Sequence, residues 1–292
     1  MARYSRRDFL RTTLATGALA SAGSLPLLAA GAKATDWVTL GNSGVKVTRL
    51  AFGTGSHGGS VQRRLGQDNF TALVRHAYDR GIRFFETSDT YDEMHTMLGI
   101  ALKGIPRDSY RLMSKVTTDD GDPHQRFDTL RRQINSDYFD IMLMHVQQGA
   151  DWPTQSARWQ DAILEAQQKK IILSRGASVH GLPALRQVPA NKWLQVAMIR
   201  MNHKGTRMDS EGNVWETAGD VPQVVDHVHQ ARAAGLGIIS MKLIGEGVFN
   251  HEDRQAAMRF AFRNAGVDTV TVGYKSPTEV DEAIDNLNAA LA

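Results

Sequence analysis

The chain of 292 residues contains no cysteine. This absence excludes a disulfide framework, a zinc site with thiolate ligands, an iron–sulfur cluster and a catalytic thiol. The ten histidines do not supply an obvious metal site instead: His227 and His229 are two positions apart, which does not place them on one helix face, and no H-E-x-x-H pattern occurs. A metal centre is therefore a disfavoured interpretation.

The chain also lacks a real excess of charge. Its formal net charge is +3, from 34 basic and 31 acidic residues, but residues 1–34 hold five of the basic residues and one acid. Residues 35–292 are therefore close to neutral, which gives no electrostatic reason to expect a nucleic-acid partner. Internal repeats and low-complexity linkers are lacking as well, so we expect one domain after residue 34.

Residues 1–34 read as an export signal. Ser5 to Leu10 reads S-R-R-D-F-L, an apolar stretch rich in Ala, Gly and Ser runs from 14 to 30, and small residues at 30–34 offer cleavage sites. This pattern is typical of a bacterial twin-arginine (Tat) signal peptide. An amphipathic helix or a membrane anchor is the alternative, although Pro26 and several glycines weaken a permanent span. We expect export by the Tat machinery to the periplasm, with no stable membrane span after cleavage.

Apolar strand patterns alternate with helical patterns through residues 35–292. We expect a hairpin over 37–50 around Gly41 to Gly44, and then eight strands, each followed by a helix. The strands are expected near 49–53, 82–86, 110–115, 139–144, 171–177, 193–199, 236–242 and 268–272, and the helices near 68–80, 92–103, 124–136, 156–169, 181–187, 221–234, 253–265 and 277–290. A spacing of roughly 30 residues suits βα units, and about 250 residues suit one α/β barrel.

Three of the expected strands end on polar residues that can do chemistry. Glu86, Lys115 and His145 each close an apolar run, and Tyr91 follows Glu86 by five positions. The carboxyl ends of the strands of a parallel barrel meet at one face. We therefore expect these four side chains to share one pocket.

The sequence around these residues resembles that of the aldo-keto reductases. Phe84 to Tyr91 reads F-F-E-T-S-D-T-Y and is similar to the family's F-F-D-T-A-D-x-Y, Ser114-Lys115 closes the next strand, and Leu143 to His145 is similar to L-L-H. The resemblance extends from about Trp37 to the end of the chain. It implies a (β/α)8 TIM barrel with an N-terminal β-hairpin, and reduction of a small aldehyde or ketone to an alcohol by a nicotinamide cofactor.

The resemblance also implies a role for each residue of this tetrad. Tyr91 would donate a proton to the substrate oxygen, the Lys115 ammonium would lower the pKa of Tyr91, and His145 would orient the oxygen. Glu86 would hold Lys115, but it is one methylene longer than the family's aspartate, so reduced activity is expected. Taken singly, a surface tyrosine, a structural ion pair and a hydrogen-bonded core histidine remain simple explanations.

The cofactor site implied by the resemblance lies on four strand ends. Its candidate residues are Gly53, Thr54, Ser178, Lys242, Gly245, Gly273, Lys275 and Ser276. Val179 and Met198 stand where the family has an asparagine and a glutamine, so amide contacts are weakened. Ser276 and Glu279 form a capping-box pattern that would also offer a phosphate site at a helix N-terminus. The resemblance favours NADPH, with NADH open because Asp281 stands where an arginine is common.

Two other functional interpretations remain open. Gly53 to Gly58 also fits G-x-G-x-x-G, which would make Glu86 a ribose ligand in a doubly wound sheet. A non-catalytic relative that binds nucleotide as a sensor or partner module would explain the departures at Glu86 and Val179. For the substrate side, we expect a flap over 203–220 with Trp215 in the pocket, and Trp152 as a possible aromatic wall.

Overall fold

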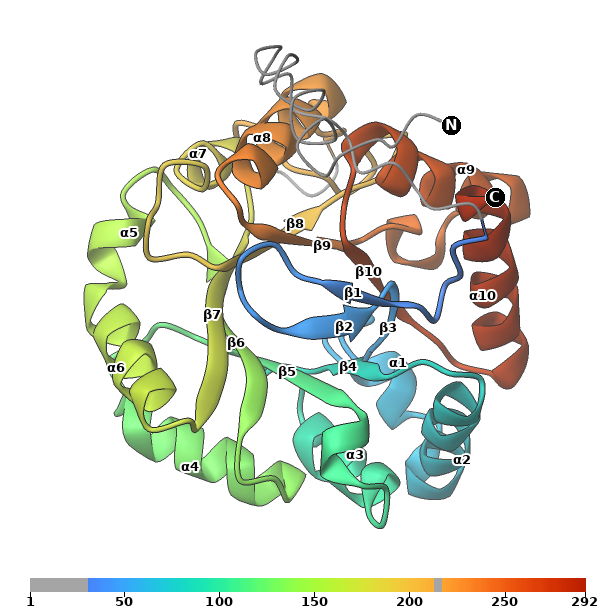
Figure 1. Cartoon of the computed structure of the whole chain (residues 1–292), viewed down its shortest axis with the longest axis horizontal. Helices are drawn as coiled ribbons and strands as arrows, with labels where there is room; N and C mark the ends of the chain where they lie inside the picture. Colours follow the sequence, from blue (N-terminus) through green and yellow to red (C-terminus); the bar gives the residue numbers. More distant parts are fainter. Residues whose placement is uncertain (1–30, 213–216) are drawn as a thin grey trace, which may run out of the picture.

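The computed structural model describes residues 31–212 and 217–292. Eight parallel strands close into a barrel in the order β10-β3-β4-β5-β6-β7-β8-β9, and helices surround it (Figure 1). The predicted (β/α)8 barrel is confirmed, and the doubly wound alternative is wrong because the sheet is closed. The twin-arginine pattern and Trp215 lie outside the described residues.

The barrel strands are short, and every one is followed by helix. The strands are β3 Leu50–Gly53, β4 Phe84–Glu86, β5 Arg111–Val116, β6 Phe139–Gln147, β7 Ile172–Val179, β8 Val196–Arg200, β9 Gly237–Met241 and β10 Thr269–Gly273. The α-helices are α1 Ser60–Arg63, α2 Gly66–Asp79, α3 Met94–Leu102, α4 Pro123–Ile134, α5 Trp152–Gln155, α6 Ala157–Gln168, α7 Leu182–Leu185, α8 Val221–Ala233, α9 His251–Arg259 and α10 Pro277–Leu291. Shorter turns of helix are η1 Arg107–Ser109, η2 Gly245–Gly247 and η3 Phe260–Ala265.

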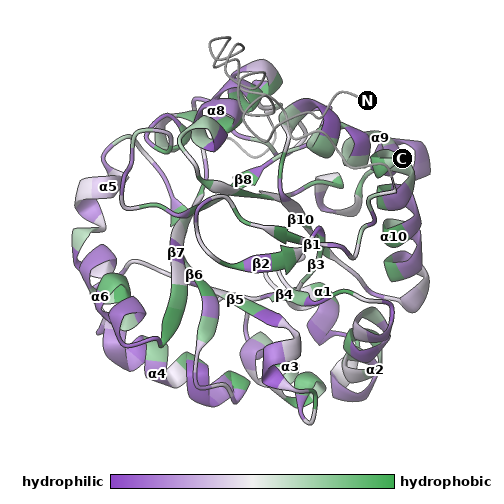
Figure 2. Cartoon of the chain, viewed as in Figure 1, coloured by the Kyte–Doolittle hydropathy of each residue, from purple (hydrophilic) through white to green (hydrophobic). Residues whose placement is uncertain are grey.

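Two apolar cores follow from the alternation of side chains along each strand. In β6, Met142 and Met144 face the helices and belong to the outer core, whereas Ile141 and Leu143 belong to a core inside the barrel. Figure 2 shows green, apolar residues along parts of the strands and purple residues over much of the helices' outer surfaces. The strands are thus covered on both faces, as a parallel sheet requires.

The predicted hairpin is present and closes one end of the barrel. β1 Trp37–Thr39 pairs antiparallel with β2 Lys46–Thr48. Leu40 and Val47 are fully buried in the inner core. Gly41 makes a bridge to Leu236, which immediately precedes β9, so the hairpin lies at the amino ends of the strands. The carboxyl ends are left to form the site.

The packed body begins before residue 35. Ala34 is fully buried, its N–H donates to Oδ1 of Asn288 at 2.8 Å, and its carbonyl accepts from Leu50 N at 2.9 Å. The boundary at 34 between signal and barrel stays a prediction. Within the described ranges, no helix combines the length and apolarity needed to cross a membrane.

Candidate active site

A polar ring at the barrel mouth consists of Glu86, Lys115 and His145, whose side chains face the inside of the barrel. Phe84, Met113 and Leu143 fill the inner core, and two residues further along each strand come Glu86, Lys115 and His145. A period of two keeps all of them on the inner face. Glu86 is 2 % exposed and Lys115 0 % exposed, so both charges lie inside the barrel rather than in solvent. The prediction that these strand ends converge is confirmed by this geometry.

A single cavity of about 700 Å³ opens from this ring. Glu86, Tyr91 and His145 line it at one end, and Gly273, Lys275 and Glu279 line it at the other. Its volume lies within the range of about 300–1,000 Å³ that small-molecule and cofactor sites occupy. Three members of the tetrad and two residues at the start of α10 therefore face one continuous space, and Lys115 lies buried behind it.

Tyr91, Lys115 and Glu86 are in direct contact. Nζ of Lys115 donates to Oε1 of Glu86 and to the Thr87 carbonyl at 3.0 Å. The same Nζ lies 4.7 Å from the centre of the Tyr91 ring, over its face. The longer side chain of Glu86 thus still reaches the amine that the resemblance assigns to it. Glu86 beside Lys115, rather than beside a ribose, is the arrangement expected of the barrel interpretation.

The pKa of Tyr91 is raised in this structure, opposite to the direction that the effect of Lys115 alone would give. Burial, with the carboxylate of Asp89 as a second cause, raises the pKa of Tyr91 above its ordinary value. Burial and the charge of Lys242 lower the pKa of Lys115 well below its ordinary value, and Glu86 neutralises the charge that remains. Tyr91 is therefore a fully protonated phenol at neutral pH, ready to donate but a weaker acid than expected.

His145 is neutral, and two hydroxyls lie beside its Nδ1. Burial, together with the charges of Lys115 and Lys242, lowers the pKa of His145 to about 2. Its Nδ1 lies 2.9 Å from Oγ of Ser88 and 3.2 Å from Oγ1 of Thr90. When either hydroxyl donates to Nδ1, the proton of the neutral ring is on Nε2. His145 can then donate one hydrogen bond from Nε2 to a substrate oxygen.

The loop that carries Tyr91 is fixed by Asp89. Its carboxylate accepts from the Thr117 N–H at 2.8 Å and from Nη1 of Arg126 at 2.5 Å, and its own N–H donates to the Lys115 carbonyl at 3.0 Å. Gly55 packs on the other side, where a Cβ would lie 2.5 Å from the Tyr91 hydroxyl oxygen. The position of the phenol is therefore set by two chain segments.

Val146, directly after His145, is strained. The register of β6 against β7 shifts between Met144 and Gln147, and Val146 has φ 51° in the left-handed region. A β-branched residue adopts this region at a cost of about 1–3 kcal/mol, mostly at functional sites. Its side chain is 39 % exposed and lines the cavity, so it is an apolar contact for whatever binds beside His145.

The candidate nicotinamide residues divide into those that line the cavity and those that do not. Gly53 lines it. Thr54 is fully buried and donates its hydroxyl to the Glu86 carbonyl at 3.0 Å, which makes it a support for the tetrad. Ser178 is also fully buried, with Oγ 3.3 Å from Nε2 of His180. Met198, at the position of the family's glutamine, lines the cavity.

Of the candidate phosphate residues, Gly273 and Lys275 lie at the other end, whereas Lys242 is near enough to the tetrad for its charge to add to the burial that lowers the pKa of Lys115 and of His145. Lys242, Gly273 and Lys275 line the cavity. Lys242 pairs with Glu246, and burial and the charge of Arg200 lower the pKa of Lys242 to about 8. Gly245 opens η2, the turn that carries Glu246.

The predicted cap at α10 is confirmed in part. Oγ of Ser276 accepts from the Glu279 N–H at 3.3 Å, as a capping box requires. Glu279 accepts from the Lys275 N–H at 2.8 Å instead of returning to Ser276. Pro277 occupies the first helical position, so α10 has a well-formed N-terminus beside the cavity.

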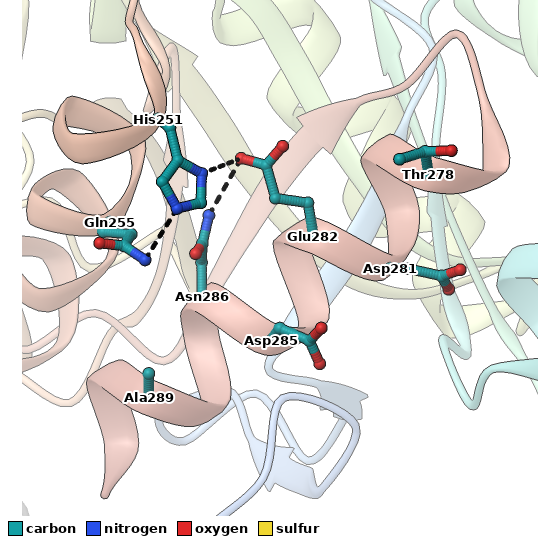
Figure 3. Close-up of a pocket in the computed structure, with 8 residues that line it drawn as sticks. All are labelled: His251, Gln255, Thr278, Asp281, Glu282, Asp285, Asn286 and Ala289. Atoms are coloured by element: carbon teal, nitrogen blue, oxygen red, sulfur yellow. Dashed lines mark hydrogen bonds and ion pairs between the residues drawn. The ribbon is translucent and has the colours of Figure 1, made fainter.

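A second, open hollow of about 530 Å³ lies between α9 and α10 (Figure 3). Glu282 accepts there from Nδ1 of His251 at 3.1 Å and from Nδ2 of Asn286 at 3.2 Å. The same carboxylate binds Arg254 through Nε at 2.7 Å and Nη2 at 3.0 Å, and both residues also line the main cavity. The cation that a further phosphate would need is thus already bound by a carboxylate.

The cavity fits the nicotinamide dinucleotide that the resemblance implies. Oγ1 of Thr271 and the hydroxyl of Tyr274 are buried without a hydrogen-bond partner among the described residues, and both residues line the cavity. Buried polar atoms normally have partners, so a polar ligand at this place supplies what the chain does not. Lys242, Lys275 and the start of α10 offer the positive groups that phosphates require.

Three polar residues of the site were not predicted, and the expectation that Trp152 forms a wall of the cavity was wrong. His180 and Arg200 line the cavity, and Asp209 is buried beside them. Arg200 follows Met198 by two positions, so the alternation along β8 was a signal for it. Trp152 is buried under α7, where its Nε1 donates to the Ala184 carbonyl at 3.2 Å, and it is not among the residues that line the cavity.

Comparison with known proteins identifies the family to which the chain belongs. The profile of the Aldo/keto reductase family matches residues 49–255, more than half of the chain. The chain therefore belongs to this family. L-galactose dehydrogenase of Arabidopsis thaliana is 36% identical over 121 residues, covering 36% of this chain and 36% of that protein. A protein described as probable aldo-keto reductase 1 of Glycine max is 31% identical over 80 residues, covering 27% of this chain and 23% of that protein.

The matches to these curated relatives span only about a quarter to a third of their length. Solved structures match over far more of the chain. An aldo-keto reductase from Pseudomonas aeruginosa has a TM-score of 0.72 at 20% identity and covers 89% of this chain and 98% of that one. The holo form of an aldo-keto reductase from Bacillus halodurans has a TM-score of 0.67 at 17% identity, with 87% and 94% covered. At such identities the structural likeness concerns the fold.

Proposed function

We propose that the chain is an NAD(P)H-dependent oxidoreductase that reduces an aldehyde or ketone to an alcohol, with Tyr91 as the proton donor. The observation that carries this proposal is one cavity lined by Tyr91 and His145, with Nζ of Lys115 4.7 Å from the Tyr91 ring centre. Family membership supports the reaction class.

Each residue of the tetrad has its own role in the proposed reaction. The protonated phenol of Tyr91 gives its proton to the carbonyl oxygen as negative charge develops there. The Nε2–H of His145 holds that oxygen in place. Glu86 keeps Lys115 inside the barrel against the tyrosine ring, and Asp89 fixes the loop, so the donor is positioned before the substrate arrives.

The reduced nicotinamide supplies the hydride when the cofactor is bound. Gly53, Thr54 and Ser178 are its proposed nicotinamide-side residues, and Lys242, Gly245, Gly273, Lys275 and Ser276 its proposed phosphate-side residues. The resemblance favours NADPH, whereas Glu279 and the Arg254–Glu282 pair favour NADH, because a 2′-phosphate would meet two carboxylates. Titration with both nucleotides decides between them.

A non-catalytic relative that binds nucleotide as a sensor or partner module is the second candidate. The raised pKa of Tyr91 and the full commitment of Lys115 to Glu86 and Thr87 favour it. Such a protein would bind NADH or NADPH and oxidise neither of them in the presence of a carbonyl compound.

The test is nucleotide oxidation by purified protein with a panel of aldehydes, ketones and quinones, measured for the wild type and for Tyr91→Phe. We expect turnover by the wild type and a loss of about 10²-fold or more in the variant, the typical contribution of one general acid. Equal rates would remove Tyr91 from the mechanism. Nucleotide binding without any turnover would favour the sensor.

We further propose that residues 1–34 direct export through the Tat pathway to the periplasm, with the nucleotide bound before export. The burial of Ala34 favours cleavage before Lys33 over cleavage after Ala34. Replacing Arg6 and Arg7 by lysine should keep the protein in the cytoplasmic fraction. Unchanged export of that variant, or a mature N-terminus at Thr35, would contradict these statements.

A further inference from the structure

A charged cluster at the ends of β7 and β8 has no role in the tetrad. Arg200, the last residue of β8, is 4 % exposed, and its Nη2 donates to Nδ1 of His180. Both side chains line the cavity that also contains Tyr91 and His145. A guanidinium in a cavity wall is a permanent positive charge in a poorly solvated place.

The cluster adjoins the place where the substrate oxygen would bind. The rings of Tyr91 and His145 are 5.7 Å apart, the rings of His145 and His180 are 6.2 Å apart, and His180 touches Arg200. These side chains form a row from the proton donor to the guanidinium. A molecule whose carbonyl lies beside Tyr91 and His145 can therefore extend along this row toward Arg200.

Charged and titratable groups of both signs surround the guanidinium of Arg200. Oδ1 of Asp209 is 3.6 Å from Nη1 of Arg200 and accepts from the Gly181 N–H at 2.8 Å. Burial raises the pKa of Asp209 to about 6, although the positive charge of Arg200 acts to lower it. Burial lowers the pKa of His145 and that of His180, and the charges of Lys115 and Lys242 act in the same direction on both. Both imidazoles are therefore neutral, and the guanidinium of Arg200 is the charged donor group beside them in the cavity wall.

We propose that Arg200, oriented by His180, binds a carboxylate of the substrate, so that the enzyme acts on aldehydes or ketones that carry a carboxylate within a few atoms of the carbonyl. This inference rests on the proposed reduction. Arginine suits the role because its planar fork can bind a carboxylate through two parallel hydrogen bonds. Lys275 and the start of α10 provide separate positive groups for the phosphates of a nucleotide.

The experiment compares carboxylates with their uncharged esters. The probes are 2-oxoacetate, 4-oxobutanoate and 4-formylbenzoate, each paired with its methyl ester, so that chain length measures the reach to Arg200. The variants are Arg200→Met, Arg200→Lys and the control Lys204→Met. The Lys204→Met substitution removes a cation from the neighbouring loop. Lys204 pairs with Asp253 at 2.7 Å and does not line the cavity.

We expect the wild type and Lys204→Met to prefer at least one carboxylate over its ester in kcat/KM by about tenfold or more, the value of charge-assisted hydrogen bonds. Arg200→Met should lose this preference and Arg200→Lys should keep part of it. An unchanged preference in Arg200→Met overturns the proposal. So does a weaker nucleotide Kd in Arg200→Met with the carboxylate preference intact, because Arg200 would then serve the cofactor.

A binding measurement separates this proposal from the proposed reduction. Tyr91→Phe, loaded with nucleotide, is titrated with each carboxylate and ester while tryptophan fluorescence is followed, and the titration is repeated in Tyr91→Phe/Arg200→Met. Absence of turnover in every protein would reject the reduction, while selective carboxylate binding that depends on Arg200 would still support the anion site. If Arg200→Met does not fold, Arg200→Met/Asp209→Asn replaces it, because this pair removes both buried charges.

Discussion

The buried pair of Lys115 and Glu86 gives the sharpest test of how the site is held. Replacing Glu86 by Gln keeps the size of the side chain and removes its charge. The Lys115 ammonium then lies at 0 % exposure, and of the two hydrogen bonds described here only that to the Thr87 carbonyl at 3.0 Å is untouched. Breaking one side of a buried pair costs about 3–5 kcal/mol.

The loss has a defined dependence on pH. In Glu86→Gln, the pKa of Lys115, already lowered by burial and by Lys242, falls further, while in the unfolded chain it is about 10.4. Between these two values the unfolded chain binds more protons than the folded chain. The stability of the variant therefore rises with pH, and its deficit relative to the wild type shrinks as the pH rises from the pKa of Lys115 in the folded variant toward the higher pKa in the folded wild type.

The assay is thermal or urea unfolding followed by circular dichroism at several pH values. At about 2–4 °C per kcal/mol for a chain of this size, the expected fall in Tm near pH 7 is about 6–20 °C. Glu86→Gln/Lys115→Met should recover most of the loss, because it leaves no uncompensated charge. Glu165→Gln, at a side chain 55% exposed, is the surface control. A loss below about 1 kcal/mol in Glu86→Gln would refute the reasoning.

Two other substitutions test separate parts of the account. Gly55→Ala should lower kcat/KM about 10²-fold or more with little loss of Tm, because its Cβ would lie 2.5 Å from the Tyr91 hydroxyl oxygen, whereas Thr96→Ala at an exposed position of α3 should leave both unchanged. Equal kinetics for the two alanine variants would show that Tyr91 is not confined as described. Burial lowers the pKa of His95 to about 4, so the wild type should lose about 3 kcal/mol of stability as the pH falls from 6.5 to 4, and His95→Gln should lose less. Parallel acid-unfolding curves for the wild type and His95→Gln would contradict this.

The barrel and the tetrad were predictable from the sequence because they depend on local patterns. Short apolar runs separated by helical patterns give the strands, and the polar residue at the end of each run marks the barrel mouth. Glu86, Lys115 and His145 each follow an inward residue by two positions, so the alternation of a strand fixes their direction.

The features that were missed depend on contacts between distant segments. The pKa of Tyr91 is set by how completely the barrel encloses it and by Asp89, neither of which a strand pattern reports. Trp152 begins the short helix α5, whose packing under α7 decides that the indole is buried. Asp209 comes from a loop without a periodic pattern, so its approach to Arg200 required the folded chain.

The central claim is that the enclosed phenol of Tyr91 delivers a proton to the reacting oxygen. The most direct measurement is the single-turnover rate of carbonyl reduction in H2O and in D2O, for the wild type and for Tyr91→Phe. The account predicts a slower wild-type rate in D2O and a variant slower by about 10²-fold or more that has lost most of this isotope dependence. A variant that reacts at the wild-type rate, with the same isotope effect, would contradict it.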